Sequence, residues 1–351
     1  MNDLDILREL KCKVGREFRY VLDGERIVAL YLTSNEYMFE GLIRHHTPQE
    51  KAEILTLISH LTSLRTLDLR RCMVINTPEE MGNLVQLTHL DLGSNFLGIV
   101  PQWVERISDL EFLNLGVNKL QMLPSFLGKF TNMRTFLAHK NEIGAFPSDF
   151  SGMRKLDYLN LYSNHFRDIP SFIWQFHSLR TFTWGLSNVK LLSPEIANLK
   201  NMEYFTFVSN KVRELPDTFG ELKKLKATRL HKNRICELPA SIGDLESLQQ
   251  LTLYQNELSS LPVTFAKLKN LEKLNIAWNK FEHFPHELSA LPNLKWLATF
   301  DNPAHFDASF APQVRKIVTH RPFNSRVDQE TIAIKPDCPT SAFVPQIGVL
   351  D

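Results

Sequence analysis

The sequence repeats itself every 23 residues over most of its 351-residue length. The stretches LTHLDLGSNFLGIVP (residues 87–101) and LEFLNLGVNKLQMLP (residues 110–124) carry leucine, asparagine and proline in the same places. If the first unit begins at Leu61, ten units of 23 residues follow one another and a partial eleventh reaches residue 302. Such a period is typical of proteins in which each unit packs only on its neighbours. We therefore expect one stacked array instead of separate globular domains.

Each unit follows the pattern LxxLxxLxLxxNxLxxLPxxhxx, whose alternating L-x-L core predicts a short strand with one buried face. The proline excludes further strand pairing, so the return segment should be irregular or 3₁₀-like. The asparagine is expected to bond to backbone groups of the neighbouring turn and so to form a ladder. Its positions are Asn95, Asn118, Asn141, Asn164, Asn210, Asn233, Asn256, Asn279 and Asn302. Cys72 takes this position in the first unit, where we expect a core residue.

This pattern resembles the leucine-rich-repeat superfamily in its 23-residue LPxxhxxL form. That form is similar to intracellular Ras-group scaffold proteins and to bacterial cytoplasmic leucine-rich-repeat proteins, and the match covers roughly residues 27–302. The resemblance implies an α/β solenoid. Its expected shape is a curved horseshoe with a parallel sheet on the concave side, short 3₁₀ or irregular segments on the convex side, and capping elements at both ends.

Residues outside 61–302 are predicted to form caps and a tail. Within residues 1–60, YVLDGERIVALYLTSN predicts a hairpin around its D-G turn followed by a zeroth repeat, and a helix should begin at Pro48 with Thr47 as its N-cap. Residues 303–320 are expected to form a C-terminal cap, and residues 321–351 an extended tail. Within that cap a helical apolar face is predicted from the spacing of Phe306, Phe310, Val314, Ile317 and Val318.

Two units depart from the consensus. In the sixth, Asn188 and Pro194 arrive one residue late, which predicts a local bulge near residues 185–187. In the eighth, Thr228 replaces a core leucine, which predicts a modest weakness in packing.

The variable strand residues between the buried leucines should face the concave, solvated side of the sheet. Aromatic residues are numerous there, and aromatics with arginine dominate interface energetics at about 2 kcal/mol or more per hot spot. An alternative remains open, in which the aromatics simply favour strands and pack on cross-strand neighbours. Eleven strands at about 4.8 Å would span roughly 50 Å, which suits a protein or extended peptide better than a metabolite. The candidate partner-binding residues are Phe112, His139, Tyr158, Tyr162, Tyr204, Arg229, His231, Lys232, Tyr254, Trp278 and Trp296.

The eighth unit, LKKLKATRLHKNRICELP, is the most basic, whereas Asp68 and Asp91 make the other end of the expected concave face mildly acidic. The basic side chains could bind an acidic or phosphorylated segment of a partner. The alternative interpretation, a solvated run of charge, also remains open. The basic residues in question are Lys223, Lys224, Lys226, Arg229, His231, Lys232 and Arg234.

Charge and motifs argue against several classes of function. The chain has 40 Lys plus Arg against 39 Asp plus Glu, whereas a nucleic-acid or membrane-surface binder should be clearly basic. The stretch HELSA lacks the second histidine of a zinc-binding helix, LGKFT has no preceding glycine at phosphate-loop spacing, and no G-x-S-x-G elbow occurs. We therefore expect no enzyme activity, no cofactor or metal, and neither a nucleic-acid nor a membrane partner.

The cysteines and the N-terminus predict a cytoplasmic location. Four cysteines lie far apart without disulfide-framework or zinc-ligand spacing, and MNDLDILRELKCKVGREF has no apolar core of a secretory signal. The favoured hypothesis is a monomeric, non-enzymatic adaptor or scaffold in signalling that holds a protein or peptide on its concave face. The alternatives are a substrate-recognition subunit of a multi-subunit enzyme, such as a ubiquitin ligase, and an injected bacterial effector. An extracellular adhesin or receptor is disfavoured by the missing signal and N-glycosylation acceptors.

Overall fold

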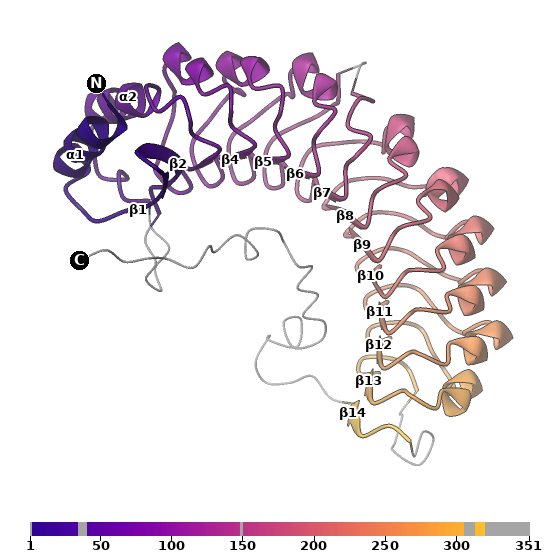
Figure 1. Ribbon diagram of the computed structural model, residues 1–351. Helices are drawn as coiled ribbons and strands as arrows, with labels where there is room; N and C mark the ends of the chain where they lie inside the picture. The colour runs from indigo at the N-terminus through magenta and orange to yellow at the C-terminus, as the bar shows by residue number, and fades with distance from the viewer. Residues whose placement is uncertain (1, 34–40, 148–149, 305–312, 320–351) are drawn as a thin grey trace. The chain divides into compact units, whose positions relative to one another are not determined.

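The computed structural model shows a repeat solenoid whose strand order, from β1 to β14, follows the chain (Figure 1). Among the described residues, the parallel strand pairs join successive units of the chain. The strands β1 and β2 pair antiparallel, as do Thr33 and Gly41 in an isolated bridge. The chain divides into two compact units, unit 1 (Met1–Asn201 and Val208–Lys211) and unit 2 (Met202–Phe207 and Val212–Asp351). The structure describes residues 2–33, 41–147, 150–304 and 313–319.

The N-terminal cap contains two helices and a hairpin. The hairpin of β1 (Arg19–Asp23) and β2 (Arg26–Tyr31) is confirmed. Helix α2 (Pro48–Ile58) begins where predicted, with a capping box between Thr47 and Glu50. Helix α1 (Asp3–Val14) was not predicted from the sequence. It buries an apolar face made of Ile6, Leu7, Leu10 and Val14.

The repeats alternate a short strand with a 3₁₀ turn. Residues paired across adjacent parallel strands are 23 apart, as Leu90 and Leu113 are. The strands are β3 (Thr66–Asp68), β4 (His89–Asp91), β5 (Phe112–Asn114), β6 (Thr135–Leu137), β7 (Tyr158–Asn160), β8 (Thr181–Gly185), β9 (Tyr204–Val208), β10 (Ala227–Arg229), β11 (Gln250–Thr252), β12 (Lys273–Asn275), β13 (Trp296–Ala298) and β14 (Lys316–Val318). The 3₁₀ turns are η1 (Glu79–Asn83), η2 (Gln102–Arg106), η3 (Ser125–Lys129), η4 (Ser171–Gln175), η5 (Pro194–Asn198), η6 (Asp217–Glu221), η7 (Ala240–Asp244), η8 (Val263–Lys267) and η9 (His286–Ala290).

Between the strands and the 3₁₀ turns lies the core of each unit. The leucines of the L-x-L pattern are buried throughout, as Leu90, Leu92 and Leu113 illustrate. Thr228 takes such a core position in β10, and its buried hydroxyl has no hydrogen-bond partner. This is the weakness in packing that the sequence predicts, because a buried, unpartnered hydroxyl costs free energy.

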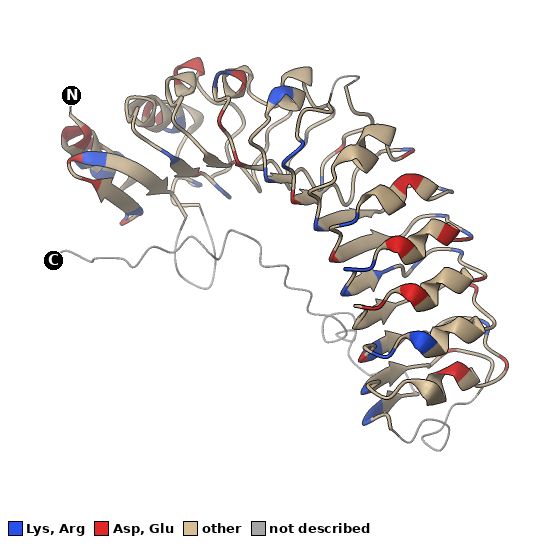
Figure 2. Ribbon diagram, turned by 45° about the vertical axis from the view of Figure 1, so that its right-hand side comes forward, with Lys and Arg blue, Asp and Glu red and all other residues tan. Residues whose placement is uncertain are grey.

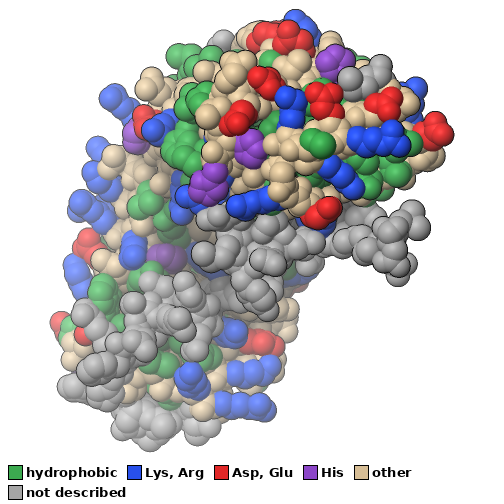
Figure 3. Space-filling view, turned by 90° about the vertical axis from the view of Figure 1, so that its left-hand side faces the viewer, with side chains coloured by type: hydrophobic (Ala, Val, Ile, Leu, Met, Phe, Trp, Pro, Cys, Tyr) green, Lys and Arg blue, Asp and Glu red, His purple; other side chains and the backbone are tan. Residues whose placement is uncertain are grey.

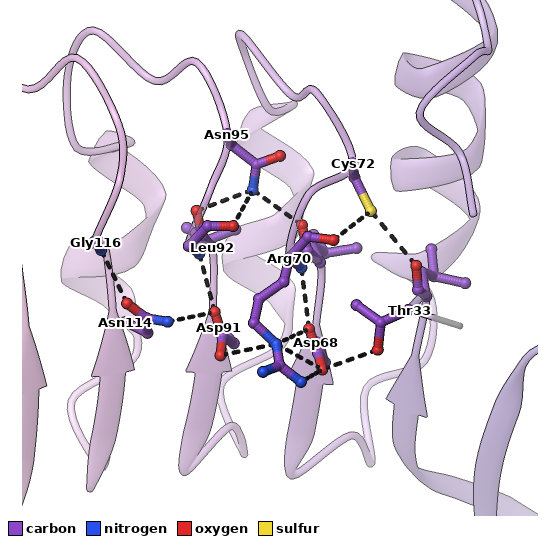
Figure 4. Close-up of polar contacts among 12 residues, drawn as sticks. Thr33, Asp68, Arg70, Cys72, Asp91, Leu92, Asn95, Asn114 and Gly116 are labelled. Carbon is purple, nitrogen blue, oxygen red and sulfur yellow. Dashed lines mark hydrogen bonds and ion pairs between the residues drawn. The ribbon is translucent and has the colours of Figure 1, made fainter. Parts of the chain in front are cut away.

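The predicted asparagine ladder is present, except that the buried Oδ1 atoms of Asn210 and Asn233 have no hydrogen-bond partner. Asn95 Nδ2 donates to the carbonyl oxygens of Leu69 and Leu92, both at 2.9 Å (Figure 4). Its Oδ1 accepts from the Val74 amide at 3.0 Å. Equivalent bonds recur at Asn118, Asn141, Asn164, Asn256, Asn279 and Asn302. Cys72 begins the ladder as a buried residue, and burial raises the pKa of its thiol to about 12. It is therefore a core residue, as expected.

The prediction of a local bulge near residues 185–187 of the sixth unit is wrong. The residue before each ladder position has a positive φ, between 52° and 60°, and Leu186 keeps this conformation. Ser187 therefore takes the ladder position and Asn188 is an exposed residue beside it. Val189 is buried and accepts from the Lys211 amide at 2.9 Å, as Leu97 and its counterparts do elsewhere. Serine has replaced the ladder asparagine without any shift of register.

The C-terminal end of the array also differs from the prediction. Residues 316–318 form strand β14, which pairs parallel with β13 and places Ile317 opposite Leu297. The helical face expected to include Val314, Ile317 and Val318 is therefore wrong there. An adjacent pair of β-branched residues favours a strand, and β14 hydrogen-bonds a strand edge that would otherwise be open. Phe306, Phe310 and the tail at 321–351 lie outside the described residues.

Candidate protein-binding faces

The strand face of unit 1 carries two kinds of aromatic residue. Phe112 on β5 is only 6% exposed, because its ring stacks on His89 of β4 with centroids 6.0 Å apart. Tyr158 on β7 is half-buried and is separated from Phe112 by Thr135 in the same register. Tyr158 therefore offers a partner more surface than Phe112 does.

His139 and Tyr162 follow β6 and β7. The His139 ring lies over Gly116 of the preceding repeat, and the Tyr162 ring lies over Gly185 of the next repeat. A Cβ atom on Gly116 would collide with the His139 ring, and one on Gly185 would lie 3.0 Å from Tyr162 Cδ2. Both rings are half-buried. Burial, with a contribution from the Lys140 charge, lowers the pKa of His139 to about 4, so its imidazole is neutral at neutral pH. Burial also raises the pKa of Tyr162.

The strand face of unit 2 has a second aromatic group. His231 stacks on Tyr254 of the next repeat, with centroids 4.3 Å apart and planes 13° from parallel, and Lys232 Nζ lies 5.8 Å from the centre of the Tyr254 ring. Burial is the main cause that lowers the pKa of His231 to about 3, and the charges of Lys232 and Arg229 lower it further. His231 is therefore a neutral hydrogen-bonding group and not a cation.

Three more candidate residues lie on the unit 2 face. Tyr204 and Trp296 are half-buried and occupy the same column on β9 and β13. Trp278 adopts a positive φ after β12 and donates its indole N–H to Asp301. These aromatics keep part of their surface in solvent while they pack on neighbouring strands.

Cations outnumber anions on the strand side of unit 2 (Figure 2). The segments 204–209, 227–232, 250–255 and 273–278 contain Arg229, Lys232 and Lys273 and no Asp or Glu. By contrast, Lys226 pairs with Glu203 at 2.7 Å and Lys223 donates to the Asp244 carbonyl at 2.9 Å. Of the basic eighth unit, Lys226 and Lys223 are thus engaged by contacts within the array.

At the other end of unit 1, Asp68 and Asp91 form a buried network with Arg70 (Figure 4). Arg70 donates to Asp68 at 2.6 Å and lies 3.3 Å from Asp91. Asp91 Oδ1 also accepts from the backbone of Gly93 and from Asn114 Nδ2, both at 2.9 Å. Burial first, and then the Asp68 charge, raise the pKa of Asp91 to about 7. These carboxylates shape the turns after the strands and expose little acidic surface.

Comparison with known proteins places the chain. The leucine-rich-repeat family model matches residues 229–281 and 246–303. No curated protein matches the chain. With the repeat, the ladder and the solenoid already established, the family match decides the assignment. The chain has the leucine-rich-repeat fold, and its residues 229–303 match the family.

Solved structures support the same fold. A leucine-rich-repeat protein of Leptospira interrogans has a TM-score of 0.67 and 24% identity, over 75% of this chain and 74% of that one. An internalin of Listeria monocytogenes has a TM-score of 0.65 and 17% identity, over 91% and 96%. A plant peptide hormone receptor in complex with RGF2 has a TM-score of 0.57 and 23% identity, over 70% and 49%. At these identities the likeness of this chain concerns the fold alone.

Sequence reasoning missed an apolar edge on unit 1 of this chain. The apolar side chains of this edge lie in the loops that follow the first strands. Two of them, Ile99 and Met122, are 68% and 65% exposed. Figure 3 shows hydrophobic side chains between charged ones on the face that it presents. The available signal was the presence of apolar residues at loop positions without a role in the core. The exposed residues of this edge are Met73, Ile75, Phe96, Ile99, Val117 and Met122.

Among the described residues, no group of three or more His, Cys, Asp or Glu side chains could hold a metal ion. No helix within the same residues is long and apolar enough to cross a membrane.

Proposed function

We propose that this protein is a non-enzymatic interaction module, an adaptor or scaffold, which holds a protein or peptide partner on the strand faces of its repeats. The observation that carries the proposal is the placement of Tyr158, Tyr204 and Trp296. Each occupies a variable strand position between fully buried core residues, and each keeps part of its ring exposed. Partly exposed aromatics on a rigid sheet are typical anchors of protein interfaces.

We further propose that the protein acts as a monomer in the cytoplasm. Cys12, Cys72 and Cys236 are free thiols, which fits a reducing compartment. The solved complex of a plant peptide hormone receptor with RGF2 supports the idea that a repeat array of this fold can hold a peptide. In the present chain the partner would be a protein segment that lies across several strands.

Affinity capture from the native cytoplasm tests the proposal. We expect the wild type to retain a partner that Tyr158→Ala/Tyr204→Ala/Trp296→Ala loses, because each anchor contributes about 2 kcal/mol. A matched control, Gln175→Ala/Val263→Ala/His286→Ala, alters exposed side chains on the 3₁₀ turns and should retain the same partner. Equal capture by all three proteins would refute binding through the strand faces.

A further inference from the structure

Three polar atoms on the strand face of β10 and β11 are buried without a hydrogen-bond partner. They are His231 Nδ1, Gln250 Oε1 and Thr252 Oγ1, and Thr252 is only 3% exposed. A buried polar group without a partner destabilises the fold, so such groups are rare unless they have a role. Register pairs Gln250 with Ala227 and Thr252 with Arg229, which places the three residues along one face of two adjacent repeats.

Positive charge surrounds these atoms. Arg229 precedes His231 by two residues, and Lys232 follows His231 directly. Lys273 on β12 is the register partner of Gln250 on β11. The nearby carboxylates already have partners, since Glu203 binds Lys226 and Glu257 binds Lys280, both at 2.7 Å. The face thus combines cations with unused hydrogen-bonding groups, a combination that favours an anion with polar neighbours.

Unit 1 contains an internal comparison for this face. The sequence His139-Lys140-Asn141, followed by Tyr162 in the next repeat, matches His231-Lys232-Asn233 and Tyr254 four repeats later. Lys140 and Lys232 even share a positive φ, of 53° and 57°. The shared residues therefore belong to a common framework.

The two copies differ in the surrounding positions. In unit 1, Leu137 takes the place of Arg229, and Tyr158 takes the place of Gln250. Asn160 takes the place of Thr252, and its Oδ1 accepts from the Tyr162 amide at 3.1 Å. His139 Nδ1 lacks a hydrogen-bond partner, as His231 Nδ1 does, but no arginine lies within two residues of His139 in the sequence. Only the unit 2 copy adds an arginine and two further unpartnered groups.

We infer that the face formed by Arg229, His231, Lys232, Gln250, Thr252 and Tyr254, the acidic-segment site, binds an extended segment of a partner protein through an Asp or Glu side chain. The inference rests on the proposed function and specifies the partner's chemistry. Arg229 and Lys232 pair with the carboxylate, and the Thr252 hydroxyl donates to it. Gln250 Oε1 accepts from a backbone N–H of the segment. The Tyr254 ring, held by His231, packs beside it.

A carboxylate is favoured over a phosphate because His231 is neutral at neutral pH and leaves Arg229 and Lys232 as the adjacent cations. One of these two cations is an arginine, whereas a phosphorylated segment usually meets a cluster of arginines. The open strand surface also suits an extended chain, whose backbone groups can bond to the amide of Gln250.

A random 12-residue peptide display library, selected on the full chain, tests the inference. We expect wild type to enrich peptides that contain Asp or Glu, and Arg229→Gln/Lys232→Gln to lose them. Synthesised peptides should bind the double variant at least about tenfold more weakly, and Asp→Asn or Glu→Gln in the peptide should have the same effect. The matched control Lys140→Gln/Arg167→Gln makes the same change in net charge on unit 1 and should bind as wild type does. An unchanged thermal unfolding midpoint will verify that each variant is folded.

The other outcomes separate this inference from the proposed function. Enriched peptides that are neutral, insensitive to Arg229→Gln/Lys232→Gln and lost on Tyr204→Ala/Trp296→Ala would overturn the acidic-segment site while supporting the proposed function. The absence of any enriched peptide would count against both. A final measurement replaces the essential Asp or Glu of the selected peptide by phosphoserine. Binding at least about tenfold tighter after that replacement would overturn the carboxylate assignment in favour of a phosphorylated segment.

Discussion

Asp91 shows how one buried carboxyl couples the stability of unit 1 to pH. Its pKa is raised to about 7, chiefly by burial, so the folded protein binds this proton more tightly than the unfolded chain does. The resulting stabilisation is complete below about pH 4 and is lost as pH rises through about 7. We expect Asp91→Asn to remove this dependence. The free energy of unfolding of Asp91→Asn minus that of wild type should be about 1–2 kcal/mol larger at pH 8 than at pH 5. Urea unfolding at the two pH values measures this difference.

The neighbouring repeats explain why asparagine fits at this position. Asn114 and Asn275 stand in the same column, and the Oδ1 of each accepts from the backbone amide two residues later. Asp68→Asn is an informative second variant, because it removes the closest partner of Arg70 and also a charge that raises the Asp91 pKa. It should destabilise the protein and weaken its dependence on pH. A difference between Asp91→Asn and wild type that stays constant from pH 5 to pH 8 would contradict the argument.

At the scale of the repeat, the ladder is interrupted at Ser187. An asparagine here would reach the carbonyls of Leu161 and Trp184 and the amide of Phe166, by analogy with the spacing of the bonds that Asn95 makes. We expect Ser187→Asn to raise the free energy of unfolding by about 1–2 kcal/mol, since each buried hydrogen bond contributes about 1 kcal/mol. Asn188→Ser, on the exposed residue next to it, should change stability by less than about 0.5 kcal/mol. The reverse ranking in denaturant unfolding would show that Asn188 is the ladder residue.

The elements also show what sequence could and could not predict. The 23-residue period, the ladder, the hairpin and the start of α2 were predictable because each depends on a local pattern of leucine, asparagine, proline or capping residues. The register of the sixth unit was not, because a serine can hold a ladder position when the neighbouring repeats fix the backbone. Strand β14 was misassigned, since apolar spacing near Ile317 cannot reveal that β13 offers an open edge. At the candidate faces, sequence indicated which columns are variable. It could not show that Phe112 is covered by His89, or that Thr252 is buried without a partner.

At the scale of the whole molecule, each repeat is stabilised by its neighbours, so damage to one end should spread only a limited distance. Leu10 of α1 is fully buried in the N-terminal cap, and Leu10→Ala should cost about 2–4 kcal/mol there. Hydrogen exchange should then show protection lost first in β2 and β3, progressively less toward β8, and unchanged in β10 to β13. Val263→Ala, on a side chain that is 81% exposed, should alter exchange nowhere. Uniform loss of protection in Leu10→Ala would mean that the two compact units unfold as a single cooperative structure, which the nearest-neighbour packing of the repeats argues against.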